Sequence, residues 1–302
     1  MIPDLPVELW LYILSLLPRA QLPKLLGVNR VCSARAMDEI YREVLFTDDG
    51  GAMLKTFRQL QYPAISSRVQ HVYIQPRFFP EMAAKPRFLK LMKRRMLHFR
   101  RKQTQMLFFN PRDDVLFIAQ CALVNCTEAT ELTIALHDFI LPASFGYLLE
   151  TVWTSLGPNL HRLTLNATLA KFPLILKDSL LSTLPNLTDL CIILSISKFP
   201  PTHKQHTLAI RALSCLLNAL TVTLQSLTLY SYELEEIVML FQALRYFPHL
   251  QKLAIHVAEG QDSFVPQTLT QFLARHENTV KHFALLEPFE TAPWNKVDLM
   301  EL

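Results

Sequence analysis

The chain has 302 residues, of which 50% are hydrophobic, so it can bury a large core in one elongated domain or two smaller ones. Its formal net charge of +4 is smaller than a dedicated nucleic-acid binder usually carries. No apolar run approaches the roughly 20 residues that span a bilayer. The apolar stretch 9–17 follows Asp4 and Glu8, where a signal peptide would be positively charged. We therefore expect a cytoplasmic or nuclear protein.

The first 44 residues predict a module of three short helices. Pro6 can open a helix that runs to residue 16 or 17. A second helix covers 21–26 and ends at Gly27, a typical C-terminal cap. A third is marked by apolar residues at helical spacing: Val28, Cys32, Ala36 and Ile40. Because so short a module forms only a small core, its surplus apolar surface belongs in an interface.

This module resembles the F-box over residues 3 to about 45. The resemblance lies in Leu5-Pro6, Glu8, Ile13-Leu14, Leu17-Pro18, Leu22, Leu25-Leu26 and Val28-Asn29-Arg30. F-boxes dock on the Skp adaptor of cullin-RING ubiquitin ligases through their first helix and the following loop. The resemblance therefore implies adaptor contacts by Leu5, Pro6, Ile13, Leu14, Leu17, Pro18, Leu22 and Leu25.

The module also departs from the F-box pattern at two positions. Gln21 stands where an acidic residue is common, and Cys32 stands where many F-boxes have Trp. The continuation from Ala36 to Val44 is similar to fungal F-box and leucine-rich-repeat families. An unrelated three-helix cap on the following repeats is the alternative interpretation.

From residue 45 to 287 the chain repeats a helix, a turn and a strand. The clearest strand segments are LHRLTL (160–165), LTDLCI (187–192), LQSLTL (224–229) and LQKLAI (250–255), with weaker copies at Tyr41, Val69, Ala129 and Val280. A Pro-Asn-Leu or Pro-His-Leu turn begins at Pro158, Pro185 and Pro248. One double spacing, between Val72 and Leu132, indicates an irregular unit or an insertion.

The segments between these strands predict helices with one apolar face. One face comprises Phe145, Leu148, Leu149, Val152, Trp153 and Leu156, and another comprises Ile237, Leu240, Phe241 and Leu244. Stacked units of this kind share one core beneath a parallel sheet. The pattern is similar to that of leucine-rich repeats, although Thr168, Ser195, Tyr232 and Ala258 stand where that family usually has Asn or Cys.

We therefore expect an α/β fold, in which an F-box-like module (1–44) precedes an irregular, right-handed α/β horseshoe with a parallel sheet (45–287). A basic insertion at about 77–112 and a tail at 288–302, where Trp294 could cap the last repeat, complete the chain. Ordinary core packing in another α/β fold is the alternative.

Side chains alternate along a strand, so the neighbours of inward-facing Leu163 and Leu165 point outward. The outward rows predict a binding surface for a target protein, formed by Arg162, Asn166, Asp189, Ser226, Tyr230, Lys252, His256 and His282. Tyr230 and Arg162 are the expected anchors, because Tyr and Arg are enriched among costly interface residues. A solvated sheet face is the alternative.

No pattern in the chain predicts catalysis. It has six glycines and lacks a GxSxG elbow, an HExxH pair and a glycine-rich phosphate loop, so we expect no catalytic residues, cofactor or small-molecule substrate. His203 and His206 lie near no acidic or Cys partner, and we expect no metal. The five cysteines form no CxxC pair and are expected to be reduced and buried.

The F-box resemblance and the repeats together imply a function without catalysis. The chain would be the substrate-recognition subunit of an SCF complex, a cullin-RING ubiquitin ligase of the Ubl conjugation pathway, with the Skp adaptor, cullin and an unidentified target protein as partners. One alternative is a non-degradative scaffold on the same adaptor. The other is a binder of nucleic acid or anionic membrane through basic residues 85–102, which are otherwise expected to form a solvated helix.

Overall fold

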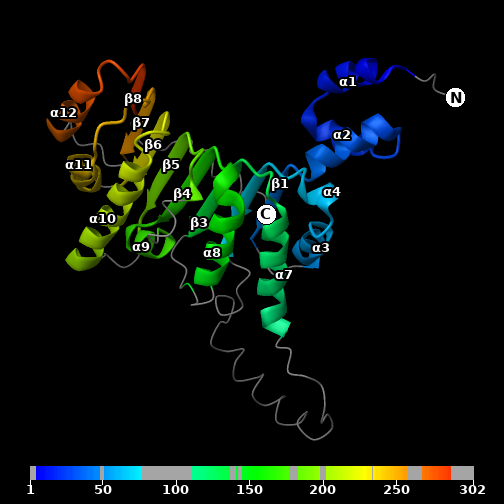
Figure 1. Cartoon of the computed structure of the whole chain (residues 1–302), viewed down its shortest axis with the longest axis horizontal. Helices are drawn as coiled ribbons and strands as arrows, with labels where there is room; N and C mark the ends of the chain where they lie inside the picture. Colours follow the sequence, from blue (N-terminus) through cyan, green and yellow to red (C-terminus); the bar gives the residue numbers. More distant parts are fainter. Residues whose placement is uncertain are drawn as a thin grey trace, which may run out of the picture. The chain divides into compact units, whose positions relative to one another are not determined.

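The computed structural model describes residues 5–47, 51–76, 111–136, 141, 145–176, 183–197, 202–232, 234–257 and 267–286 (Figure 1). The predicted basic segment 85–102 and tail 288–302 lie outside these residues. The described strands form one eight-stranded parallel sheet in chain order, β1 to β8, and helices alternate with the strands. This confirms the predicted α/β class and parallel sheet. The chain divides into two compact units, Met1–Ala135 with Phe139–Leu160, and Leu136–Asp138 with His161–Leu302.

The first unit opens with the predicted helical module. Its elements are α1 (Val7–Ser15), the 3-10 helix η1 (Arg19–Leu25) and α2 (Arg30–Ile40). Pro23 lies inside η1 and has no N–H to donate, which disfavours a regular α-helix there. Gly27 has φ of 90°, a left-handed conformation that costs glycine little, as its predicted capping position requires. The Asn29 side chain then caps α2 by accepting a 2.7 Å hydrogen bond from the Cys32 amide.

The rest of the first unit supplies three short parallel strands and their helices. These elements are β1 (Glu43–Phe46), α3 (Gly51–Gln59), α4 (Pro63–Ser66), β2 (His71–Ile74), α7 (Pro111–Asn125), β3 (Glu131–Leu136), α8 (Phe145–Leu156) and η3 (Gly157–Asn159). Strand β2 pairs directly with β3, with Val72 opposite Leu132. All six residues of the predicted α8 face are buried.

The second unit repeats the strand-and-helix alternation more regularly. It contains β4 (Arg162–Thr168), η4 (Leu169–Lys171), α9 (Phe172–Ile175), β5 (Asp189–Ser195), α10 (His203–Ala219), β6 (Ser226–Ser231), α11 (Leu234–Ala243), β7 (Lys252–Val257), α12 (Gln267–Arg275) and β8 (His282–Leu286). Helices α10, α11 and α12 lie side by side along the sheet (Figure 1). The predicted apolar residues of α11 and Leu244 after it are buried.

Residues at the same position of each six-residue strand segment lie opposite one another on neighbouring strands. The fourth residues of these segments form the row Leu163, Leu190, Leu227, Leu253 and Phe283. The first four residues of this row are at most 2% exposed, whereas Phe283 is 42% exposed and Leu285, two residues later, is 45% exposed. The expectation of a buried inward row therefore holds for β4 to β7 and is wrong for β8, the last described strand, which has a strand neighbour on one side only.

Polar side chains at the C-terminal ends of α10 and α12 join successive repeats of the second unit. The Asn218 side-chain Nδ2 donates to Ala243 O at 3.0 Å, and its Oδ1 accepts from the backbone N–H of Arg245 at 2.8 Å. His276 is fully buried, and its Nε2 accepts from the Phe247 amide at 2.9 Å. Because Nε2 accepts, Nδ1 carries the proton and donates to Phe272 O at 2.7 Å. His276 is therefore neutral and structural.

Candidate interaction surfaces

Helix α1 carries an apolar surface that the described residues leave exposed. This α1 surface comprises Val7, Leu9, Leu11, Tyr12, Ile13 and Leu16, whose exposed fractions run from 39% for Ile13 to 67% for Leu16. The same helix buries Leu14 in a small core with Leu22 and Cys32, against which Trp10 and Leu17 also pack. Several exposed apolar side chains on one short helix are typical of a protein-binding site.

The predicted adaptor-contact residues separate into exposed and buried groups. Pro6, Ile13 and Pro18 are exposed, and Leu5, Leu17 and Leu25 are half-buried. Leu14 and Leu22 are only 3% and 2% exposed, because they form the core of the module. Leu14 and Leu22 are therefore core residues of the module, and contact of the eight residues with an adaptor stays a prediction.

Residues of the α1 surface that the F-box resemblance did not mark include Val7, Leu11, Tyr12 and Leu16. Their signal in the sequence is an excess of apolar residues around the whole circumference of the helix. One buried stripe cannot absorb so many. The apolar sequence of the helix predicted surplus apolar surface, but it did not specify which residues the small core would bury.

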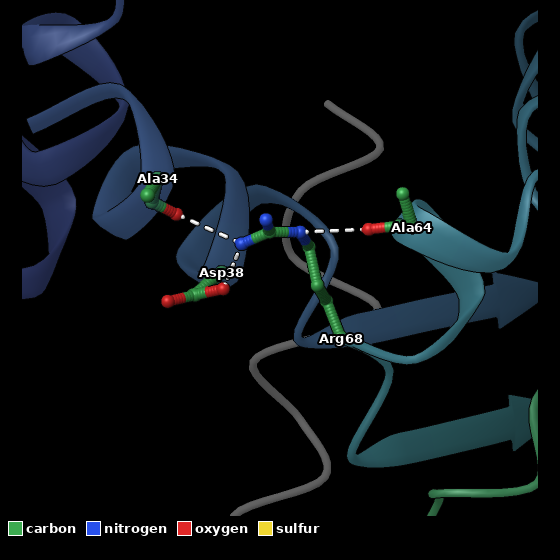
Figure 2. A network of polar contacts seen from close by, with 4 residues as sticks. All are labelled: Ala34, Asp38, Ala64 and Arg68. Carbon is green, nitrogen blue, oxygen red and sulfur yellow. Dashed lines mark hydrogen bonds and ion pairs between the residues drawn. The ribbon is translucent and has the colours of Figure 1, made fainter. Parts of the chain in front are cut away.

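Arg68 ties this module to the segment that follows β1 (Figure 2). Its Nη1 donates to Ala34 O of α2 at 3.0 Å and also pairs with the Asp38 carboxylate. Its Nε donates to Ala64 O of α4 at 2.9 Å. One planar guanidinium thus joins the last helix of the module to α4, a geometry that lysine cannot reproduce.

The strands of the first unit begin with a row of two glutamates and a histidine. Glu43, His71 and Glu131 lie opposite one another, and they line a polar pocket together with Arg19, Glu39, Arg42 and Gln70. His71 Nδ1 lies 3.3 Å from the Glu43 carboxylate, and this hydrogen bond lowers the pKa of Glu43. The His71 Nε2 is 3.0 Å from Thr133 Oγ1. These contacts hold the His71 side chain between Glu43 and Thr133, in the polar lining of the pocket.

The second unit presents a sheet face on which the predicted target-binding residues lie. One row is Arg162, Asp189, Ser226, Lys252 and His282, and a second is Asn166, Ile193, Tyr230 and His256. Arg162, Lys252 and His282 are exposed, and the other predicted residues are half-buried. All eight predicted residues therefore share one face, opposite the buried leucine rows. Their binding of a target stays a prediction.

Two aromatic rings meet on this face. The Tyr230 and His256 rings stack with centroids 4.0 Å apart and planes 14° apart. Partial burial raises the pKa of Tyr230 and lowers the pKa of His256. Both rings are therefore neutral at pH 7, and they form an uncharged aromatic patch. Two strands away from Tyr230 in the same row, Asn166 Oδ1 accepts a hydrogen bond from the Ser195 hydroxyl.

Two of the cysteines, Cys126 and Cys191, are unsuited to nucleophilic chemistry. Burial raises the pKa values of Cys126 and Cys191 to about 12, so both stay protonated at neutral pH. All five cysteines are free, as expected. Cys32 and Cys126 are buried as expected, Cys121 and Cys191 are half-buried, and the expectation of burial is wrong for Cys215, which is exposed on α10.

Within the described parts of the chain, no group of three or more His, Cys, Asp or Glu side chains could hold a metal ion. No helix among the same residues is long and apolar enough to cross a membrane. A scan against models of protein families and a search of curated proteins both gave no match. The α1 surface and the sheet face are therefore interpreted from their own residues.

Proposed function

We propose that the chain is a non-enzymatic substrate-recognition subunit of an SCF-type cullin-RING ubiquitin ligase. Its F-box-like module docks on the Skp adaptor, and its leucine-rich-repeat-like array, a right-handed α/β horseshoe, binds the target protein. The observation that carries the proposal is the α1 surface, in which five large apolar side chains of a nine-residue helix and the side chain of its C-cap residue Leu16 remain exposed. A stable helix with so much exposed apolar area favours a partner helix or groove.

The apolar area available on α1 suits adaptor docking. Burying the exposed half of one such side chain contributes roughly 1 kcal/mol, so six of them supply several kcal/mol before the cost of association. The small core of Leu14, Leu22 and Cys32 keeps the helix in one orientation, which limits that cost. Arg68 adds a second restraint by holding α2 to α4.

The array assignment is supported by the repeated order of helix, Pro-Asn-Leu or Pro-His-Leu turn, and strand. Leu160, Leu187 and Leu250, the turn leucines, are all fully buried. The following strands lie in register, so their outward residues form continuous rows. Rows of this kind can contact several side chains of a partner polypeptide at once.

Adaptor docking is tested by co-expressing the chain with a Skp adaptor and cullin and measuring how much of each it retains. The test variant is Ile13→Asp/Leu16→Asp, which places charges in the α1 surface without touching the buried core. The matched control is Leu208→Asp/Val222→Asp, which makes equivalent changes at exposed apolar residues of the second unit. Circular dichroism confirms that each variant is folded.

We expect the α1 variant to lose at least tenfold in adaptor retention and the control variant to behave as the parent chain, since a buried unpaired charge costs more than 1.4 kcal/mol. Equal retention by the α1 variant and the parent refutes docking through this surface.

Degradation is tested separately, by comparing the half-lives of array-bound proteins with and without the chain. Unchanged half-lives of all of them would establish the scaffold function instead.

A further inference from the structure

The buried rows of the second unit end at β8 with two exposed apolar side chains. Phe283 lies opposite Leu253 of β7, and Leu285 continues the row of Ile255. Leu253 and Ile255 are only 1% and 0% exposed, as core residues are. Phe283 and Leu285 are 42% and 45% exposed. Because one residue separates Phe283 from Leu285, both side chains point to the same side of the strand and form one apolar surface, the β8 surface.

Helix α12 directs its apolar side chains toward α11. Its buried residues are Leu269 and Phe272. The Phe272 ring lies with its centroid 4.8 Å from that of Phe241 in α11 and 4.0 Å from that of His276. Apart from the half-buried Leu273, the other residues of α12 are glutamine, threonine, alanine and arginine. Within the described ranges, α12 therefore has few apolar side chains left to cover the β8 surface.

The sequence that follows β8 is rich in apolar residues. It begins next to the β8 surface, because β8 ends at Leu286. Segment 287–302, which lies outside the described residues, reads EPFETAPWNKVDLMEL. Its large apolar residues are Phe289, Trp294, Val297, Leu299, Met300 and Leu302. A short tether keeps such a segment at an effective concentration of roughly millimolar near the strand it leaves, which favours it over an untethered occupant.

Two prolines favour packing of this segment on the side chains of β8 over extension of the sheet. Pro288 and Pro293 have no N–H to donate to a neighbouring strand, and proline favours the turns that a returning chain needs. Trp294 is eight residues beyond Leu286, and a chain of that length spans up to roughly 27 Å. The path back from Leu286 to Phe283 covers only roughly 10 Å.

We propose that segment 287–302 docks on the β8 surface, with Trp294 against Phe283 and Leu285, and so closes the apolar core of the second unit. A terminal repeat has no successor to bury its apolar face, and stacked repeats therefore need a cap with a polar outer side. The charged residues of the segment would supply that polar side, and Trp294 has its largest apolar side chain. The inference goes beyond the proposed function, because it involves neither the adaptor nor a target.

The test measures how far Trp294 is shielded from solvent in the purified full-length chain. The chain has three tryptophans, so the fluorescence of Trp294 is obtained by subtracting the spectrum of Trp294→Phe from that of the parent. We expect Trp294 to emit at shorter wavelength than a solvated tryptophan and to be quenched weakly by acrylamide, because a docked indole is shielded from water. Sedimentation at several concentrations reports the oligomeric state.

Two variants locate the contact, each measured with and without Trp294→Phe. Phe283→Ser/Leu285→Ser removes the β8 surface, and Leu208→Ser/Val222→Ser makes equivalent changes at other exposed apolar residues of the second unit. We expect the first to increase acrylamide quenching of Trp294 and shift its emission to longer wavelength, and the second to leave both unchanged. Circular dichroism confirms that each variant is folded.

Hydrogen exchange provides a second measurement that leaves β8 itself intact. Trp294→Ser should speed exchange of the β8 amides about tenfold and leave the β4 amides unchanged, because loss of a cap opens the structure locally. Unchanged β8 exchange in this variant overturns the inference, even where the β8 variant fails to fold.

Two fluorescence outcomes also overturn the inference. One is a solvated Trp294 in the parent chain, and the other is a shielded Trp294 that the β8 variant leaves unchanged. Shielding that is lost on dilution, together with dimers in sedimentation, would assign the β8 surface to a second copy of the chain instead. None of these measurements involves the adaptor, so their failure leaves the proposed function untouched.

Discussion

Leu253 and Lys252 are neighbours on β7 that face opposite sides of the sheet. Leu253 is 1% exposed and lies between Leu227 and Phe283, whereas Lys252 is exposed. Introducing aspartate at each position therefore places the same carboxylate in two different environments. The comparison tests which face of the second unit is the core and which is the surface.

The cost at Leu253 has two parts. Removing a buried leucine side chain costs about 2 to 5 kcal/mol. A buried aspartate must also be protonated, and a pKa raised by about 3 units adds roughly 4 kcal/mol at neutral pH. The sum approaches the whole stability of a typical domain, about 5 to 15 kcal/mol. Lys252→Asp changes only a solvated side chain, and we expect a change within about 0.5 kcal/mol.

Urea unfolding followed by circular dichroism measures both variants. We expect Leu253→Asp to unfold at a much lower urea concentration than the parent or to remain unfolded without urea, and Lys252→Asp to match the parent. Comparable midpoints for Leu253→Asp and the parent would show that this row is not the core of the unit, and the register argument would fail. A lower midpoint for both variants would instead mean that β7 is buried on both faces.

Two further predictions concern His276 and Arg68. Burial lowers the pKa of His276 below 6.5, so the unfolded chain binds the proton more tightly than the folded chain does. The free energy of unfolding should therefore fall as pH drops through 6.5 toward the folded-state pKa. Urea unfolding at several pH values should show a shallower fall in this free energy for His276→Gln than for the parent chain, and equal slopes against pH would contradict the prediction. Arg68→Ala should cost about 1 to 2 kcal/mol, discounted for partial exposure, and speed hydrogen exchange in α2, while exposed Arg58→Ala should not.

The sequence by itself predicted the repeating architecture, because each element carries its own periodicity. The apolar face of α8 and the leucine rows of β4 to β7 are buried where the spacing placed them. The register followed as well, since every unit sets the same motif position at the same point of its strand. The predicted outward residues share one face for the same reason, as side chains must alternate along a strand.

Only the tertiary structure decided how much of each apolar residue is covered, because burial depends on neighbours that periodicity does not specify. Leu14 and Leu22 are core residues because α2 packs over them, although the F-box resemblance implied partner contacts. Phe283 keeps the motif position of Leu253 but is exposed, since no strand follows β8 among the described residues. The Tyr230–His256 stack depends on two residues 26 positions apart meeting on adjacent strands. The sequence thus determined which faces exist, and packing determined which of their side chains remain available to a partner.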